Sequence, residues 1–322
     1  MNIRKGTALG FAIRSSILVG IIVASAGLSR AQIFISSDTN TAIYEYNLDG
    51  SQVGTGPIIS GLTQASNLAV SGNDLFIAEG STIAEYTTSG VEISGALISG
   101  VSNPSLTISG SNLYVANSNG TVGVYGLGST PGTLTSSNAD LFSIASGELN
   151  GIAVSGTNIF VTNAATNTIG EYTTSGGTVN ASLASTSNDP IQIVAQGLNL
   201  YVDEYTDGSG ALSVYTLGSS PGTISSSSTL YSSLGVSDNV DGLGLVGNNL
   251  LVVKQNDATI GGGTVASYAK DGSASNGSLI TGLTDPQGMA IEQSTPEPST
   301  WAMLLGGLGL LALWRRRIAR RT

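Results

Sequence analysis

A four-residue apolar segment recurs six times between residues 33 and 253. Each copy is followed by a polar turn and a second apolar stretch that ends on a tyrosine. Successive tyrosines are 40, 39, 47, 43 and 53 residues apart. A repeat of roughly this length, with several short strands per unit, is typical of a β-propeller blade. The segments are 33–36, 75–78, 113–116, 159–162, 200–203 and 250–253, and the tyrosines are Tyr46, Tyr86, Tyr125, Tyr172, Tyr215 and Tyr268.

Another short strand and a tight turn precede five of the six segments. The joints at Ser71-Gly72, Ser109-Gly110 and Ser155-Gly156 have the chemistry of hairpin turns, in which glycine supplies a positive φ. We interpret these as the innermost strands, whose small residues (Ala69, Ala153 and Gly244) suit the crowded axis of a ring. The segments that follow are apolar at consecutive positions, as a strand buried on both faces requires.

A fourth, outer strand is visible at 96–99 and 278–281 and is weaker near Leu183 and Tyr231. The matching stretches 126–132 and 217–222 are expected to be loops between the third and fourth strands.

The two ends of the repeat region complement each other. The first unit begins at its second strand, residues 33–36, whereas residues 289–292 form an inner strand with no second strand after it. Together they complete one blade and leave no open sheet edge. The sequence therefore predicts an all-β fold, a six-bladed β-propeller over residues 32–294 with one-plus-three strand closure. A β-solenoid is the competing architecture, but its repeats are shorter and would not leave complementary half-units.

The first 31 residues have the features of a secretory signal peptide. Basic residues from Arg4 to Arg14 precede an apolar stretch at 17–26, and Ser29 and Ala31 are the small residues that a signal peptidase reads. We predict cleavage between Ala31 and Gln32. An uncleaved anchor is the alternative, but the apolar stretch is short of the ~20 residues needed to span a bilayer.

The last 28 residues, 295–322, have a composition of their own. Pro296, Glu297 and Pro298 precede an apolar run at 301–314, which is followed by Arg315, Arg316 and Arg317. As a helix the run would be about 21 Å long, against a hydrocarbon core of about 30 Å. We predict a marginal transmembrane helix with a basic stop that keeps its end in the cytoplasm. A permanent single-span anchor is the alternative to a segment that is removed.

This order of motif, short apolar helix and arginines resembles the PEP-CTERM sorting signal of Gram-negative bacteria. The resemblance implies signal peptidase and exosortase as export partners and transient anchoring in the inner membrane. It also implies an outer-surface or extracellular-matrix location, in bacteria that produce exopolysaccharide. It implies nothing about the activity of the preceding repeats.

The composition of the repeat region excludes several functions. Residues 32–295 contain two lysines and 20 acidic residues, a net charge of −18, and no arginine, histidine, cysteine or tryptophan. Nucleic-acid binding requires a basic face, so it is excluded. Disulfides, thiolate metal sites and Ser-His-Asp or Cys-His catalysis are excluded for lack of the residues.

The repeats also resemble the YVTN and NHL propeller families. The stretch 113–122, with Leu113-Tyr114-Val115-Ala116-Asn117 at its start, is close to the YVTN pattern, and Pro286-Gln287-Gly288-Met289-Ala290 is similar to an NHL strand entry. The resemblance implies a fold and not a function, because propellers serve as binding proteins, scaffolds and enzymes.

Polar residues at the entries to the inner strands form the candidate site. Their amides and carboxylates are expected in loops at one end of the central channel, where they could bind a ligand or hold calcium, which prefers oxygen ligands. The same residue types are ordinary in turns. The candidate ligand face consists of Asn67, Asn103, Asn150, Asp189, Asp241 and Asp285.

We interpret the protein as a non-enzymatic surface or matrix protein that binds a saccharide, peptide or protein partner at these loops. No catalytic residue, metal site or cofactor is assigned. The alternative is a calcium-dependent hydrolase or lactonase that resembles gluconolactonase, although no glutamate of that family's pattern stands at the entry to the first unit. The stretches 203–208 and 238–242 resemble parts of calcium loops but lack the twelve-residue spacing that ends in glutamate.

Overall fold

The computed structural model describes residues 31–39, 41–206, 209–234, 240–255, 262–273 and 275–292. The predicted signal peptide up to Arg30, the sorting motif, the apolar run and the arginines lie outside the described residues. Within the described part, no helix is long and apolar enough to cross a membrane.

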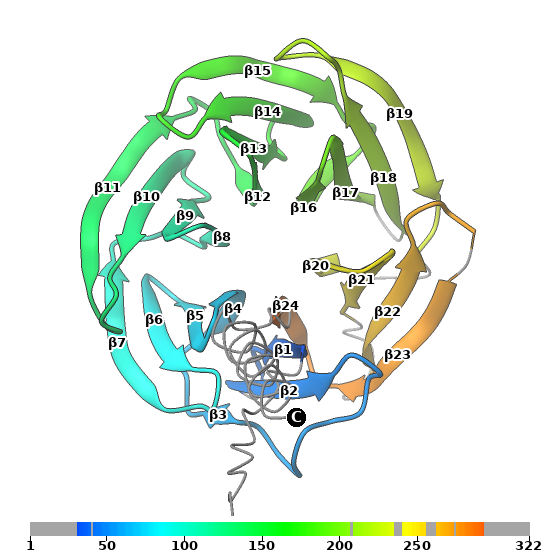
Figure 1. The fold of residues 1–322 in the computed structure, drawn as a ribbon. Coiled ribbons are helices and arrows are strands. Elements are labelled where there is room, and N and C mark those ends of the chain that lie inside the picture. The colour runs from blue at the N-terminus through cyan, green and yellow to red at the C-terminus, as the bar shows by residue number, and fades with distance from the viewer. Residues whose placement is uncertain are drawn as a thin grey trace, which may run out of the picture. The chain divides into compact units, whose positions relative to one another are not determined.

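The described strands form six four-stranded antiparallel sheets arranged as blades around an axis (Figure 1). Blade 1 combines β24 with β1–β3, and blades 2 to 6 take β4–β7, β8–β11, β12–β15, β16–β19 and β20–β23. The innermost strands are β4 (Ala65–Ser71), β8 (Ser105–Ser109), β12 (Leu149–Ser155), β16 (Asp189–Gln196), β20 (Val240–Val246) and β24 (Pro286–Glu292). The second strands are β1 (Gln32–Ser37), β5 (Asp74–Glu79), β9 (Asn112–Ala116), β13 (Asn158–Asn163), β17 (Asn199–Thr206) and β21 (Asn249–Lys254).

The recurring tyrosines lie on the third strands, as the repeat predicts. The third strands are β2 (Ala42–Asn47), β6 (Thr82–Thr87), β10 (Thr121–Leu127), β14 (Thr168–Thr173), β18 (Ser209–Leu217) and β22 (Gly263–Ala269). The outer strands are β3 (Ile59–Ser60), β7 (Glu92–Ser99), β11 (Leu134–Ser143), β15 (Thr178–Ser185), β19 (Ile224–Tyr231) and β23 (Ser275–Leu283). The outer strand of blade 1 is therefore much shorter than the others.

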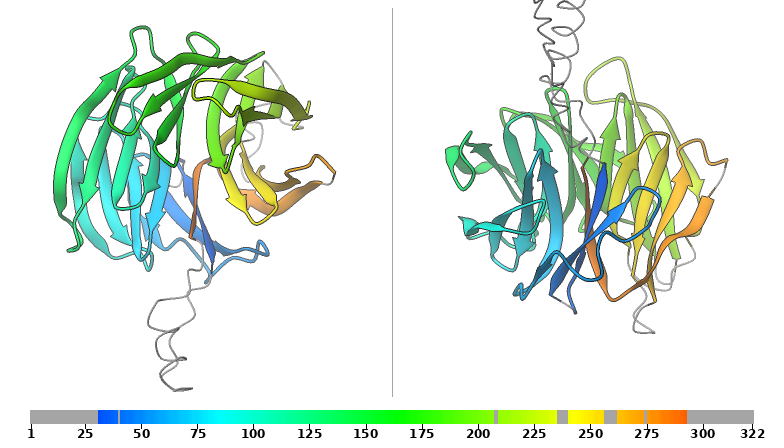
Figure 2. Two further views of the ribbon diagram at one scale, coloured as in Figure 1. Left: turned by 45° about the horizontal axis from the view of Figure 1, so that its top comes forward. Right: turned by 60° about the horizontal axis from the view of Figure 1, so that its bottom comes forward.

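Strand pairing confirms the predicted closure. β1 lies between β24 and β2, with Phe34 opposite Ala290 and Ile35 opposite Met289. The two segments lie side by side in both views of Figure 2. β1 begins at Gln32, which pairs with Glu292. Cleavage before Gln32 stays a prediction.

The hydrophobic core lies between neighbouring blades. Ile33, Phe34 and Ile35 are all fully buried, because each face of a second strand packs against another blade. One cluster joins Phe34 and Ile43 of blade 1 to Leu68 and Leu75 of blade 2. Since all six sheets and their core clusters lie within residues 32–292, this part of the chain contains the contacts that it needs to fold by itself.

The loops after the third strands connect one blade to the previous one. The strands extend slightly further than expected, because Gly126 and Leu127 belong to β10 and Leu217 to β18. Beyond them, the Gly132 amide donates to Glu85 Oε2 at 3.0 Å, and the Gly222 amide donates to Glu171 Oε2 at 2.9 Å. The matching Pro-Gly sequences therefore place equivalent amides on buried carboxylates of the preceding blades.

Candidate functional site at the mouth of the central channel

The entries of all six inner strands surround one polar cavity of about 380 Å³, here called the mouth cavity. Its volume falls in the range of small-ligand sites. Amides and hydroxyls dominate its lining, and Asp241 contributes a carboxylate. The lining residues are Gln64, Ser66, Asn67, Asn103, Pro104, Ser105, Asn150, Ile191, Gln192, Asp241 and Gln287.

Glycines at two strand entries allow adjacent blades to approach closely. A Cβ on Gly151 would lie 2.6 Å from the Ile191 carbonyl oxygen of the next blade, and a Cβ on Gly288 would lie 2.3 Å from that of Ser66. Both contacts are too short for any side chain. The glycine of the Pro-Gln-Gly entry is therefore required by the packing around the mouth.

Four of the six predicted ligand-face residues line the mouth cavity: Asn67, Asn103, Asn150 and Asp241. The expectation that they occupy loops is wrong for three of these four, because Asn67, Asn150 and Asp241 lie within strands β4, β12 and β20. Only Asn103 lies in a loop, with a φ of 38°. The strands begin earlier than the apolar pattern suggests, because the inner strands carry register shifts near their first residues.

Asp189 and Asp285 are not among the residues that line the mouth cavity. Asp189 is the exposed first residue of β16, a strand residue and not a loop residue. Asp285 precedes β24, where Thr39 Oγ1 donates to its Oδ2 at 2.9 Å and Gln287 Nε2 donates to its Oδ1 at 2.8 Å. The structure therefore gives Asp285 a local role in the turn.

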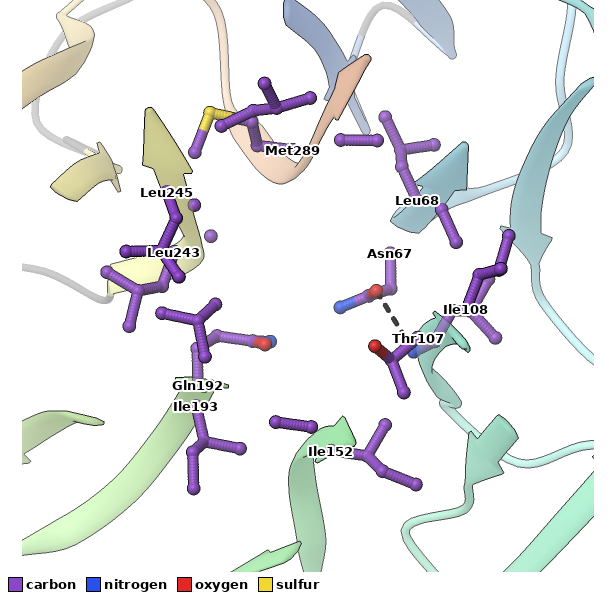
Figure 3. A pocket seen from close by; sticks show the side chains of 18 of the residues that line it. Asn67, Leu68, Thr107, Ile108, Ile152, Gln192, Ile193, Leu243, Leu245 and Met289 are labelled. Atoms are coloured by element: carbon purple, nitrogen blue, oxygen red, sulfur yellow. Dashed lines mark hydrogen bonds between the residues drawn. The ribbon is translucent and has the colours of Figure 1, made fainter. Parts of the chain in front are cut away.

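Gln192 is the residue that sequence analysis missed and that changes the site most. Figure 3 shows the amides of Asn67 and Gln192 pointing toward one another across the opening. Asn67 Oδ1 accepts a hydrogen bond from the Leu106 amide at 3.2 Å, and Gln192 Nε2 donates to the Asn150 carbonyl at 3.3 Å. These bonds join neighbouring blades and fix both amides at the opening. Alignment of the inner strands would have indicated Gln192, because it precedes Ile193 just as Asn67 precedes the equivalent Leu68.

Below the mouth the channel becomes apolar. A second cavity of about 320 Å³ shares Asn67, Gln192 and Asp241 with the mouth cavity, and its walls are aliphatic side chains such as Leu68, Ile152 and Leu243 (Figure 3). The small inner-strand residues Ala69, Ala153 and Gly244 line it, as expected. A ligand at this end would therefore meet polar groups first and an apolar floor behind them.

A buried acid on β17 lies behind the inner strand that carries Gln192. Asp203 is 1% exposed, and its Oδ1 accepts a hydrogen bond from the Gln192 backbone amide at 2.6 Å. Among the described residues, its Oδ2 has no hydrogen-bond partner. Burial raises the pKa of Asp203 well above its ordinary value, the hydrogen bond from Gln192 lowers it, and the neighbouring Asp241 and Glu204 raise it further.

In two of the other five blades a hydroxyl occupies the place that Asp203 takes in blade 5, and in the remaining three the residue there is Ala or Val. In blade 1 the Ser36 hydroxyl donates to the Ser66 carbonyl of the next blade at 2.5 Å, and in blade 4 the Thr162 hydroxyl donates to the Ile191 carbonyl at 2.9 Å. Asp203 occupies the equivalent position in blade 5. A protonated carboxyl can donate as those hydroxyls do, whereas a carboxylate cannot.

The described residues contain no group of three or more His, Cys, Asp or Glu side chains positioned to hold a metal ion. The oxygen atoms at the mouth that could ligate a metal ion belong mainly to amides. The carboxylates nearby are those of Asp241 and the buried Asp203. Calcium binding remains a prediction that depends on these groups.

Comparison with solved structures supports the fold. The chain is similar to a chain of a nidogen/laminin complex, with a TM-score of 0.63, 13% identity, and coverage of 83% of this chain and 100% of that one. It is also similar to a proposed 6-phosphogluconolactonase from Bacteroides fragilis (TM-score 0.54, 12% identity, 84% and 99% coverage). A protein from Lactobacillus plantarum gives a TM-score of 0.54 at 14% identity, with 82% and 100% coverage. No curated protein sequence matches the chain.

One family model matches the C-terminal region. Residues 294–317 match the PEP-CTERM protein-sorting motif. This segment is a PEP-CTERM sorting motif. It contains Pro296, Glu297 and Pro298 and the arginines from Arg315 to Arg317, as predicted from the sequence. The PEP-CTERM motif implies export through a membrane-anchored intermediate in Gram-negative bacteria and processing by an exosortase.

Proposed function

We propose that this protein is a non-enzymatic binding protein of the outer surface or extracellular matrix, and that its mouth cavity binds a neutral saccharide. The observation that carries the proposal is the pair of opposed amides, Asn67 and Gln192, at the entrance to a closed ring. An amide both donates and accepts hydrogen bonds, as sugar hydroxyls do. The net charge of −18 on residues 32–295 disfavours anionic ligands.

The mouth can be tested with variants that keep the internal hydrogen bonds. Asn67→Asp retains the acceptor for the Leu106 amide but replaces the donor with a negative charge. We expect it to weaken binding of fragments of exopolysaccharide from the producing bacterium about tenfold, since a lost hydrogen bond in a desolvated site costs on the order of 1–3 kcal/mol. Isothermal titration calorimetry on the propeller of residues 32–292 measures this directly.

Asn138→Asp is the matched control, because Asn138 is an exposed residue of β11 and the substitution changes the charge by the same amount. Its affinity should equal that of the wild type. Equal weakening by both variants would indicate general repulsion and reject the mouth as the site, and so would an unaffected Asn67→Asp variant.

A calcium-dependent hydrolase or lactonase is the alternative, favoured by the nearness of the Asp203 and Asp241 carboxylates. A bound ion would stabilise the folded state by mass action. Under that alternative, the melting temperature of the propeller should fall by several degrees when a chelator removes calcium, and Asp241→Asn should abolish the difference. We expect the same melting temperature with calcium and with chelator.

Removal of the sorting segment is a separate prediction. The apolar run at 301–314 is too short for a secure anchor, so we expect the surface form to lack it. Mass spectrometry of the protein from the surface fraction should find a C-terminus upstream of Trp301 and an N-terminus at Gln32. A surface form that retains the arginines would show that the segment is a permanent anchor.

A further inference from the structure

A third cavity, of about 350 Å³, lies where blades 6 and 1 meet, away from the axis. We call it the seam cavity. β1, β2 and the turn after β2 form one side, and residues 279–286 form the other. Its lining residues are Ile35, Ser36, Ser37, Tyr44, Tyr46, Gly50, Gln52, Leu279, Ile280, Thr281, Gly282, Leu283, Thr284 and Pro286.

The seam cavity is associated with a departure from the repeat at Tyr44. Tyr44 pairs with Ile35 of the second strand. The five equivalent pairs place a small residue there: Ala84, Gly123, Gly170, Ser213 and Ala266. Blade 1 alone among the six has an aromatic side chain at this position.

The outer strands explain why the position is otherwise small. A Cβ on Gly170 would lie 2.7 Å from the ring of Tyr172 and 3.2 Å from the Ala181 carbonyl of β15, and a Cβ on Gly123 would lie 3.2 Å from the Ala139 carbonyl of β11. In blade 1 the outer strand is reduced to Ile59–Ser60, whereas the other outer strands run along the rim (Figure 1). The shortened strand leaves room for Tyr44 and for the cavity beside it.

The chemistry of the seam cavity suits a neutral sugar ring. Tyr44 is partly exposed and provides aromatic surface, against which the apolar face of a sugar can pack, whereas Tyr46 behind it is buried. Gln52 and Thr281 are exposed and supply an amide and a hydroxyl for sugar hydroxyls. No charged side chain is among the lining residues, so an ionic ligand would find no partner in this cavity.

We propose that the seam cavity is a second saccharide-binding site, separate from the mouth, with Tyr44 as its main contact. The site lies between the outer strand of blade 6 and the second and third strands of blade 1. The proposal rests on the cavity and on Tyr44, and it does not require the mouth to bind a ligand.

Tyr44→Ala is the informative variant, because Ala84 and Ala266 occupy the same position in blades 2 and 6 and show that the fold accepts alanine there. The probes are exopolysaccharide fragments and neutral cello-, malto- and chito-hexaoses. We expect at least one of them to bind the propeller of residues 32–292, and Tyr44→Ala to weaken that binding at least about tenfold. Tyr44→Phe should retain it, because the aromatic surface remains.

Asn67→Asp separates the two sites in the same titrations. Binding that survives Asn67→Asp and is lost in Tyr44→Ala supports the seam site, whatever happens at the mouth. The proposal is overturned if Tyr44→Ala binds every probe as the wild type does, or if none of these saccharides binds. A melting temperature of Tyr44→Ala close to that of the wild type confirms that lost binding does not reflect unfolding.

Discussion

Replacing Phe34 by alanine should lower the free energy of unfolding by about 3–5 kcal/mol, since a large buried side chain is lost and a cavity is left. Phe34 is fully buried in β1, opposite Ala290 of the last strand, and it packs against Leu68 of blade 2. The change therefore weakens the joint that closes the ring as well as the contact between two blades. Equilibrium unfolding in urea, followed by circular dichroism, measures the effect.

Phe142→Ala is the matched control. Phe142 is partly buried on the outer strand β11 and stacks on Tyr172 with ring centroids 4.2 Å apart. An aromatic pair of this kind contributes about 0.5–1.5 kcal/mol beyond its buried area, and the site lies far from the closure. A cost for Phe34→Ala no greater than that for Phe142→Ala would contradict a ring held together by β1.

The second large effect concerns pH and Asp203. Because burial raises the pKa of Asp203 in the folded state, the folded protein binds this proton more tightly than the unfolded chain does. The stabilisation that this tighter proton binding gives the folded state is complete below the ordinary carboxyl pKa of about 4. It is lost as pH rises through the folded-state pKa. Burial also raises the pKa of Glu45 and Glu85, which adds to the trend. We therefore expect the propeller to be more stable at pH 5 than at pH 8.

Asp203→Asn isolates this contribution. An asparagine can accept from the Gln192 amide and donate through its own amide group, like the protonated acid. The variant should match the wild type at pH 5, exceed its melting temperature at pH 8, and show a flatter pH profile. Asp189→Asn removes the same charge from an exposed residue of β16 and should leave the slope unchanged. Equal flattening in both variants would assign the trend to net charge.

Asp203→Ala should behave differently, because it leaves the Gln192 amide without its acceptor. An unsatisfied buried donor costs about 1–3 kcal/mol. This loss should be greatest at pH 5, where the wild-type carboxyl is protonated and makes its full set of interactions.

The architecture could be predicted because it depends on repetition. The apolar segments around Phe34, Phe76 and Phe160 must be buried on both faces, and only a closed set of blades buries all of them. The closure followed from the same pattern, since Met289 and Ile33 belong to two incomplete units. Each copy of the repeat is independent evidence for the same sheet, so local ambiguity in one copy is corrected by the others.

The site could be predicted only in part, because it depends on where the copies differ. The inner strands shift register at equivalent points, and the side chains there decide the site, since Asn67 and Gln192 occupy a position at which blades 4 and 6 have Gly151 and Gly242. Tyr44 was visible as the one aromatic in a column of small residues, but its significance requires knowing that β3 is short. Such differences lie in a few residues, and the average repeat contains no information about them.

Ring closure has a consequence for secretion across the inner membrane. β1 cannot acquire its partner on the axial side until β24 has been synthesised, and the sorting motif follows β24 within two residues. A chain that ends before Pro286 therefore lacks both the β1–β24 pairing that closes the ring and the sorting motif. Because exosortase processing requires the motif, only a chain that has been synthesised past its closing strand can be processed.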